Sequence, residues 1–166
     1  MYSDTQLVRI RRLAFDEYED LEERSRLVSQ VETSAELHQV AWWFNHDGFE
    51  VRELVDMAAH RHCSKGTALM IYWGLQPDWI YRQQEKGKRL DAIHLACLPF
   101  LKKLEQRVKE NDFRGDAIAF SPEAMHGRQF RDDDHYRPGV RLVPAWMKLD
   151  VTGAVVERCR FEDEIT

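Results

Sequence analysis

The sequence has no excess of basic residues and no long apolar run. Its 24 Lys and Arg residues are outnumbered by 29 Asp and Glu residues, which gives a net charge of −5. A protein that binds nucleic acid or an anionic membrane through charge alone needs a basic surface, so the composition argues against both classes. The most apolar stretch, residues 68–73, is too short to cross a bilayer, and the N-terminus lacks the basic start of a signal peptide. We therefore expect a cytoplasmic protein.

Cysteine, glycine and proline are also scarce. Three widely spaced cysteines without a Cys-x-x-Cys pair argue against a disulfide framework, and eight Gly and five Pro are too few for a low-complexity chain. The chain is instead 43% hydrophobic and 32% charged, which is typical of a folded globular protein. We expect a single domain over residues 1–166, because a chain of this length buries about 70% of its unfolded surface.

Helix signals dominate the first part of the chain. Residues 14–30 are rich in Glu, Arg and Leu and predict an amphipathic helix. Thr33 and Glu36 form a capping-box pattern, which predicts a second helix through Phe44. This helix is expected to end at residues 45–48, where Gly48 supplies the positive φ that a helix C-terminus often needs.

Further helices are predicted at residues 51–61, 67–74, 77–81 and 90–108. Ser64 is the expected N-cap of the second of these, whose residues are apolar on nearly all sides and therefore belong at the centre of the core. Pro99 is expected to kink the last one, since its ring removes a backbone hydrogen bond. Successive helix pairs suggest a solenoid, but no fixed sequence period is evident.

The final third changes character. Residues 117–120 form a short apolar run that suggests a strand, and Ser121-Pro122-Glu123 is a typical helix start. From residue 140 onward two runs flank Thr152-Gly153, which suggests a β hairpin or an extended tail. The expected fold class is therefore mainly α: a compact multi-helix domain with a helical body at about 1–112, followed by an α+β tail at about 113–166 with a small C-terminal β hairpin or extended segment.

The densest group of reactive side chains is His60, His62 and Cys63. Two imidazoles one residue apart do not share a helix face, so they would chelate a metal only from an extended segment. A site of His62, Cys63, His94 and Cys97 would offer ligand types that suit zinc. A polar helix end and buried thiols explain the same residues without a ligand, so we expect no metal and no cofactor.

Cys63 also invites a nucleophile hypothesis. A thiol just before a helix N-terminus has a lowered pKa, and Asp47 would be a candidate to orient a histidine base. The spacing does not select this arrangement over a capping serine beside a core cysteine. A small metal-dependent or thiol hydrolase using His60, His62 and Cys63 is therefore kept as an alternative function.

Aromatic side chains are abundant, with five Trp, five Tyr and eight Phe. Trp42 and Trp43 are adjacent, so on a helix they point about 100° apart and do not both fit a narrow core stripe. A half-exposed aromatic near acidic charge is typical of a protein-binding anchor. The candidate partner-binding residues are accordingly Trp43 and two acidic runs, namely Asp132, Asp133 and Asp134, and Glu162, Asp163 and Glu164.

Motifs in the middle of the chain carry a family resemblance. They are Leu37-His38-x-x-Ala41, the turn Asn45-His46-Asp47-Gly48-Phe49-Glu50, and Cys63-Ser64-Lys65-Gly66-Thr67-Ala68-Leu69 followed by Trp73, with a plausible continuation at Val143-Pro144-Ala145-Trp146-Met147-Lys148. Over about residues 35–105 the chain resembles the bacterial domain of unknown function family 4274. His46 departs from the aromatic or acidic residue usual in that turn. The resemblance implies a small, mostly helical accessory protein and, by analogy, an immunity partner of a secreted antibacterial toxin.

These observations favour a non-enzymatic binding protein. The specific expectation is a cytoplasmic bacterial immunity protein that covers the active site of a cognate toxin, for example a nuclease, because an acidic protein is steered toward a basic cleft. The expected partner is thus a protein, with no direct contact to nucleic acid or membrane. A scaffold or regulatory subunit of a larger assembly is a third hypothesis.

Overall fold

Helices make up most of the fold, which confirms the predicted class. In the computed structural model the described part of the chain comprises residues 2–15, 21–44, 51–126 and 138–161. Its helices are α1 (Asp4–Phe15), α2 (Leu21–Ser29), α3 (Ser34–Trp43), α4 (Val51–Ala59), α5 (Lys65–Gly74), α6 (Pro77–Glu85), α7 (Ala92–Glu110) and α8 (Pro122–His126). Two 3₁₀ turns follow, η1 (Val140–Leu142) and η2 (Ala145–Met147). Among the described helices, none combines the length and the apolar character needed to span a membrane.

The N-terminal region differs from its prediction. The single helix expected over residues 14–30 is wrong, because Arg24 of α2 donates to the carbonyl oxygen of Leu13 in α1 at 2.9 Å, whereas residues eleven apart in one helix lie about 16 Å apart along its axis. The apolar stripe of the first helix starts earlier in the chain, with Ile10 and Leu13, which are both buried. The residues around these two are mostly charged or polar, so the composition alone does not indicate the apolar stripe of α1.

Three predicted helix starts are confirmed. Thr33 Oγ1 accepts a hydrogen bond from the backbone N–H of Glu36 at 3.1 Å, and Ser64 Oγ accepts one from that of Thr67 at 3.1 Å. The hydroxyl of Ser121 accepts one from the first turn of α8 at 3.2 Å. Each hydroxyl satisfies a backbone donor that the first helical turn leaves without an internal partner.

The remaining boundaries agree in part. α4 and α7 match the helices predicted at residues 51–61 and 90–108, and α7 runs through Pro99 without interruption. The expected kink at that proline stays a prediction. Residues 45–48, the expected end of the helix that begins after Thr33, lie outside the described residues.

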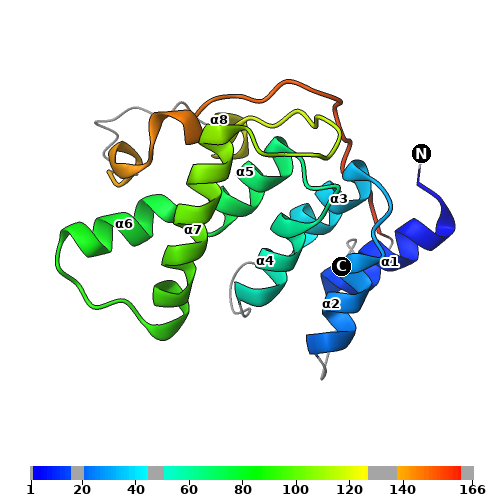
Figure 1. Cartoon of the computed structure of the whole chain (residues 1–166), viewed down its shortest axis with the longest axis horizontal. Coiled ribbons are helices and arrows are strands. Elements are labelled where there is room, and N and C mark those ends of the chain that lie inside the picture. Colours follow the sequence, from blue (N-terminus) through cyan, green and yellow to red (C-terminus); the bar gives the residue numbers. More distant parts are fainter. Residues whose placement is uncertain (1, 16–20, 45–50, 127–137, 162–166) are drawn as a thin grey trace.

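The helices stack in two rows (Figure 1). α1, α3 and α5 pack side by side, while α2 and α4 pack together and α4 contacts α7. α1, α3 and α5 begin 30 or 31 residues apart. These three helices therefore recur at a nearly constant spacing and contact their neighbours, as in helical solenoids. The repeat lies in the helix starts rather than in residue identities, which is why the sequence shows no period.

Helix α5 lies at the centre of the core, as predicted. All side chains of residues 67–73 are buried. The indole Nε1 of Trp73 donates to the carbonyl oxygen of Met147 at 2.9 Å, and the hydroxyl of Tyr72 donates to Glu105 Oε1 at 2.8 Å. These buried bonds tie α5 to η2 and α7, because a polar group without a partner is costly inside a core.

Of the two alternatives predicted for the C-terminal segment, a β hairpin or an extended tail, the described residues form the extended tail. Phe120 and Val151 exchange backbone hydrogen bonds of 2.9 and 2.8 Å, so the region around residues 152–153 pairs with an earlier part of the chain. Gly153 is needed for this approach, because a Cβ there would lie only 2.4 Å from the carbonyl oxygen of Ala117. Gly153, which the sequence suggests as a turn residue of a local hairpin, therefore serves in a long-range pairing instead.

The tail then docks on α3. In Figure 1 its orange-to-red trace crosses from the η turns to α3 and α1. The side-chain amide of Gln39 donates to the carbonyl oxygen of Glu157 at 2.5 Å and accepts from the backbone N–H of Cys159 at 3.1 Å. The guanidinium of Arg158 lies 3.6 Å from the ring centroid of Trp43. The tail is therefore held on α3 by hydrogen bonds between the Gln39 side chain and the tail backbone, and by the contact between Arg158 and Trp43.

Candidate functional site

The candidate site is built around His38, a buried histidine on α3. Its side chain faces α5, and the residue is only 1% exposed. The ring Nδ1 lies 3.0 Å from the hydroxyl oxygen of Thr67 in the first turn of α5. That hydroxyl lies 2.9 Å from the hydroxyl of Ser64, the N-cap of the same helix. A short chain of polar groups therefore connects the start of α5 to the middle of α3.

Burial keeps this histidine uncharged. It lowers the pKa of His38 from 6.5 to about 4, and loss of solvation is the only cause of the shift. Near neutral pH the ring is therefore a neutral imidazole, with one N–H donor and one acceptor nitrogen. Such a ring recognises a polar group by hydrogen bonding and not by charge.

His38 lines a pocket of about 490 Å³ between α3, α5, α8 and the tail. Its walls are mostly apolar and come from segments far apart in the sequence, including Ala41, Trp42, Met70, Phe120, Met125 and Val156. The described lining residues carry no Asp, Glu, Lys or Arg side chain. Concave, mostly apolar sites with one or two polar groups are the usual form of a binding site.

The rim of the pocket is unusually apolar for an exposed surface. Trp42 is 43% exposed, Met125 is 45% exposed and Val155 is 82% exposed. All three line the same pocket, although they belong to α3, α8 and the tail. Grouped apolar side chains on a surface mark interaction sites more often than single ones do. We call these three residues the apolar rim.

Two other hollows adjoin this pocket. One shares Trp42 and Val156 with it and is lined by tail residues that include Arg158 and Arg160. The other shares Met125 with it and lies between the end of α5, α6 and α8. The His38 pocket therefore shares lining residues with both of these hollows.

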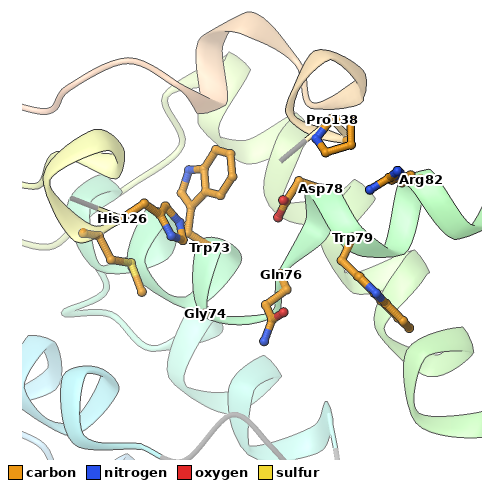
Figure 2. A pocket seen from close by; sticks show the side chains of 10 residues that line it. Trp73, Gly74, Gln76, Asp78, Trp79, Arg82, His126 and Pro138 are labelled. Atoms are coloured by element: carbon orange, nitrogen blue, oxygen red, sulfur yellow. The ribbon is translucent and has the colours of Figure 1, made fainter. Parts of the chain in front are cut away.

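Figure 2 shows the second hollow from close by. His126 from α8 lies beside the ring of Trp73, with ring centroids 5.3 Å apart, and Asp78, Trp79 and Arg82 follow along α6. This hollow measures about 470 Å³ and is more polar in its residue types than the His38 pocket. Met125 is the lining residue that it shares with the His38 pocket.

The structure does not support Cys63 as a nucleophile. The thiol is 1% exposed, and burial raises its pKa to about 12, with a smaller opposing effect from the charge of Arg107. A catalytic thiol needs the opposite environment, in which the thiolate is stabilised and accessible. The proposed orienting residue, Asp47, lies outside the described residues.

The zinc ligand set is not brought together either. His60 and His62 are neighbours, with ring centroids 5.4 Å apart, and Cys63 lies near Arg107 of α7. Cys97 precedes Arg107 by ten residues on the same helix, which separates them by about 15 Å along the axis. Within the ranges that the structure covers, no three His, Cys, Asp or Glu side chains are placed to hold a metal ion.

The predicted partner-binding residues fall into two groups. Asp132, Asp133, Asp134, Glu162, Asp163 and Glu164 lie outside the described residues, so their role stays a prediction. Trp43 is half-buried, and its ring is surrounded by Phe15, Phe161 and Arg158 at 5.4, 5.7 and 3.6 Å. Its neighbour Trp42 is the exposed member of the pair.

Sequence reasoning did not single out His38 or Thr67 as a functional residue. A signal was present, because His38 lies three residues before Ala41 on the face that also carries Leu37 and is expected to be buried. A histidine on an apolar face is a polar group that needs a partner. The identity of that partner depends on how α3 packs on α5.

Comparison of the chain with family models, with curated proteins and with solved structures gives no match. The resemblance over residues 35–105 therefore stays a prediction, and the functional argument depends on the site itself.

Proposed function

We propose that this protein is a non-enzymatic binding protein that holds a protein partner against the apolar rim of the His38 pocket. The observation that carries the proposal is the grouping of Trp42, Met125 and Val155 around one depression. Tryptophan and methionine are enriched at the centres of protein interfaces, where their burial supplies most of the binding free energy.

The partner that we propose is a basic protein, in particular a cognate antibacterial toxin such as a nuclease, bound in the cytoplasm. The net charge of −5 supports this choice, since long-range attraction between an acidic and a basic protein accelerates their encounter. Docking over the toxin's active site would block its substrate. This is the role of an immunity protein.

The test is co-expression with the product of the adjacent gene, followed by co-purification and calorimetric titration. We expect protection of the cells and a one-to-one complex that weakens as salt is added. Trp42→Ala and Val155→Asp should each weaken binding by about tenfold or more, as for residues at an interface centre.

Val8→Asp is the matched control, because Val8 is also a highly exposed valine, 59% exposed, but lies on α1 and does not line the pocket. It should leave the affinity unchanged. The proposal is wrong if the complex does not form. It is also wrong if the rim variants bind as tightly as the control.

A further inference from the structure

We propose that the His38 pocket binds a small, neutral, largely apolar molecule that accepts a hydrogen bond from His38 Nε2–H through a carbonyl oxygen. The ligand would lie inside the pocket, whereas the protein partner proposed above would contact its rim, and neither proposal depends on the other. The argument begins with the hydrogen positions in the chain Ser64–Thr67–His38.

The hydroxyl groups of Ser64 and Thr67 are both fully buried, so each needs an acceptor for its proton. Ser64 Oγ already accepts from the backbone N–H of Thr67 at 3.1 Å. In the part of the chain that the structure describes, Thr67 Oγ1, at 2.9 Å, is the acceptor available to the Ser64 hydroxyl. Ser64 therefore donates to Thr67.

The direction of the next bond follows. With Thr67 Oγ1 accepting from Ser64, its own proton is directed to His38 Nδ1, 3.0 Å away. The opposite arrangement, in which His38 donates and Thr67 donates onward, would leave the Ser64 hydroxyl without an acceptor. The hydrogen bonds from Ser64 to Thr67 and from Thr67 to His38 thus require the His38 tautomer that carries its proton on Nε2.

The Nε2–H group is left for a ligand. Among the described residues Nε2 has no hydrogen-bond partner, and His38 lines the pocket whereas Thr67 does not. The other side chains that line the pocket are apolar apart from that of Ser121. An apolar molecule with a carbonyl group would accept the hydrogen bond from His38 Nε2–H and pack against the apolar walls of the pocket.

Size and charge restrict the class of ligand. A volume of about 490 Å³ suits a molecule the size of a fused-ring aromatic compound. No ionised side chain lines the pocket, and burial keeps the imidazole neutral, so neither anions nor cations are favoured. We therefore exclude nucleotides and sugar phosphates as ligands of this pocket.

The probe for this site is Prodan, a neutral naphthalene fluorophore with one propionyl carbonyl. Titration of the full chain with Prodan should give saturable binding with a blue-shifted emission. His38→Phe keeps an aromatic ring but removes the donor, and should weaken binding by about tenfold, the effect of one hydrogen bond. Ala124 is an exposed residue of the pocket lining, so Ala124→Trp should fill the pocket and abolish Prodan binding.

The matched control is His94→Phe, which removes a histidine from α7 outside this pocket and should leave Prodan binding unchanged. A second measurement uses the wild-type chain only: a long-range ¹H–¹⁵N spectrum should show His38 protonated at Nε2. Absence of saturable binding, equal binding by Ala124→Trp, or protonation at Nδ1 would each overturn the proposal. These readouts need no protein partner, so their failure is distinct from failure of the proposed function.

Discussion

At the scale of single residues, α3 presents polar side chains to the interior, and each has a tertiary partner. Glu36 illustrates this. The capping box predicted from Thr33 and Glu36 is only half formed, because the Glu36 carboxylate accepts from the backbone N–H of Glu32 at 2.9 Å and pairs with Arg9 at 2.9 Å. A residue that the sequence assigns to a local cap therefore also fastens α3 to α1. His38 and Gln39 make similar long-range contacts.

The buried and half-buried cysteines should differ in reactivity. In the folded protein at pH 8, Ellman's reagent should label Cys159 first, because this residue lies on the tail and is half-buried. Cys63 should react only on unfolding, since a pKa of about 12 instead of 9 leaves about a thousandfold less thiolate, in addition to its burial. Cys159→Ser should remove the fast phase. A fast phase that survives this substitution would contradict the assignment.

At the scale of elements, the approach of α5 to residues 117–120 depends on Gly66. A Cβ at this position would lie 2.2 Å from the carbonyl oxygen of Ile118, which is a backbone atom that does not move independently. Gly66 therefore has a close-packing role at this contact. The same contact positions Phe120 in the wall of the His38 pocket.

Gly66→Ala should accordingly lower the free energy of unfolding by about 2 kcal/mol, the typical cost of overpacking. Gly87 is the matched control: it has φ +64° and open space around its Cβ position, so Gly87→Ala should cost only about 1 kcal/mol of backbone strain. Urea denaturation of the two variants measures the difference. Equal losses of unfolding free energy in the two variants would show that the close approach of Gly66 to Ile118 does not cause the destabilisation.

At the scale of the whole molecule, the two rows of helices bury His38 where protonation is costly. The unfolded chain binds a proton at this residue below pH 6.5, whereas the folded chain does so only below about pH 4. Between these values the unfolded state holds more protons, so stability falls as the pH falls. Above pH 6.5 the stabilisation that depends on neutral His38 is fully present, and below about pH 4 the contribution of His38 to stability changes no further.

We expect this residue to remove about 3 kcal/mol of stability between pH 6.5 and pH 4. Burial lowers the pKa of His60 as well, which acts in the same direction, whereas burial raises the pKa of Glu36, which acts in the opposite direction. The difference between the wild type and His38→Phe in chemical denaturation across this pH range isolates the His38 contribution. A variant with the same pH dependence as the wild type would refute it.

The sequence by itself determined the helical class, the starts of α3, α5 and α8, and the central place of residues 68–73. These features depend on caps and on hydrophobic pattern, which act over a few neighbouring residues. The early start of α1 was missed because its apolar stripe is short and mixed with charged residues.

Only the tertiary structure decided the pairing of the tail with residues 117–120 and the composition of the pocket. The pocket joins His38, Met70, Met125 and Val155, which are separated by tens of residues in the chain. Local propensity carries no information about such contacts, because they form only when packing outweighs the entropy of closing the long loops between them. A buried histidine can be noticed in the sequence, but its partner and its free nitrogen are set by how α3 meets α5.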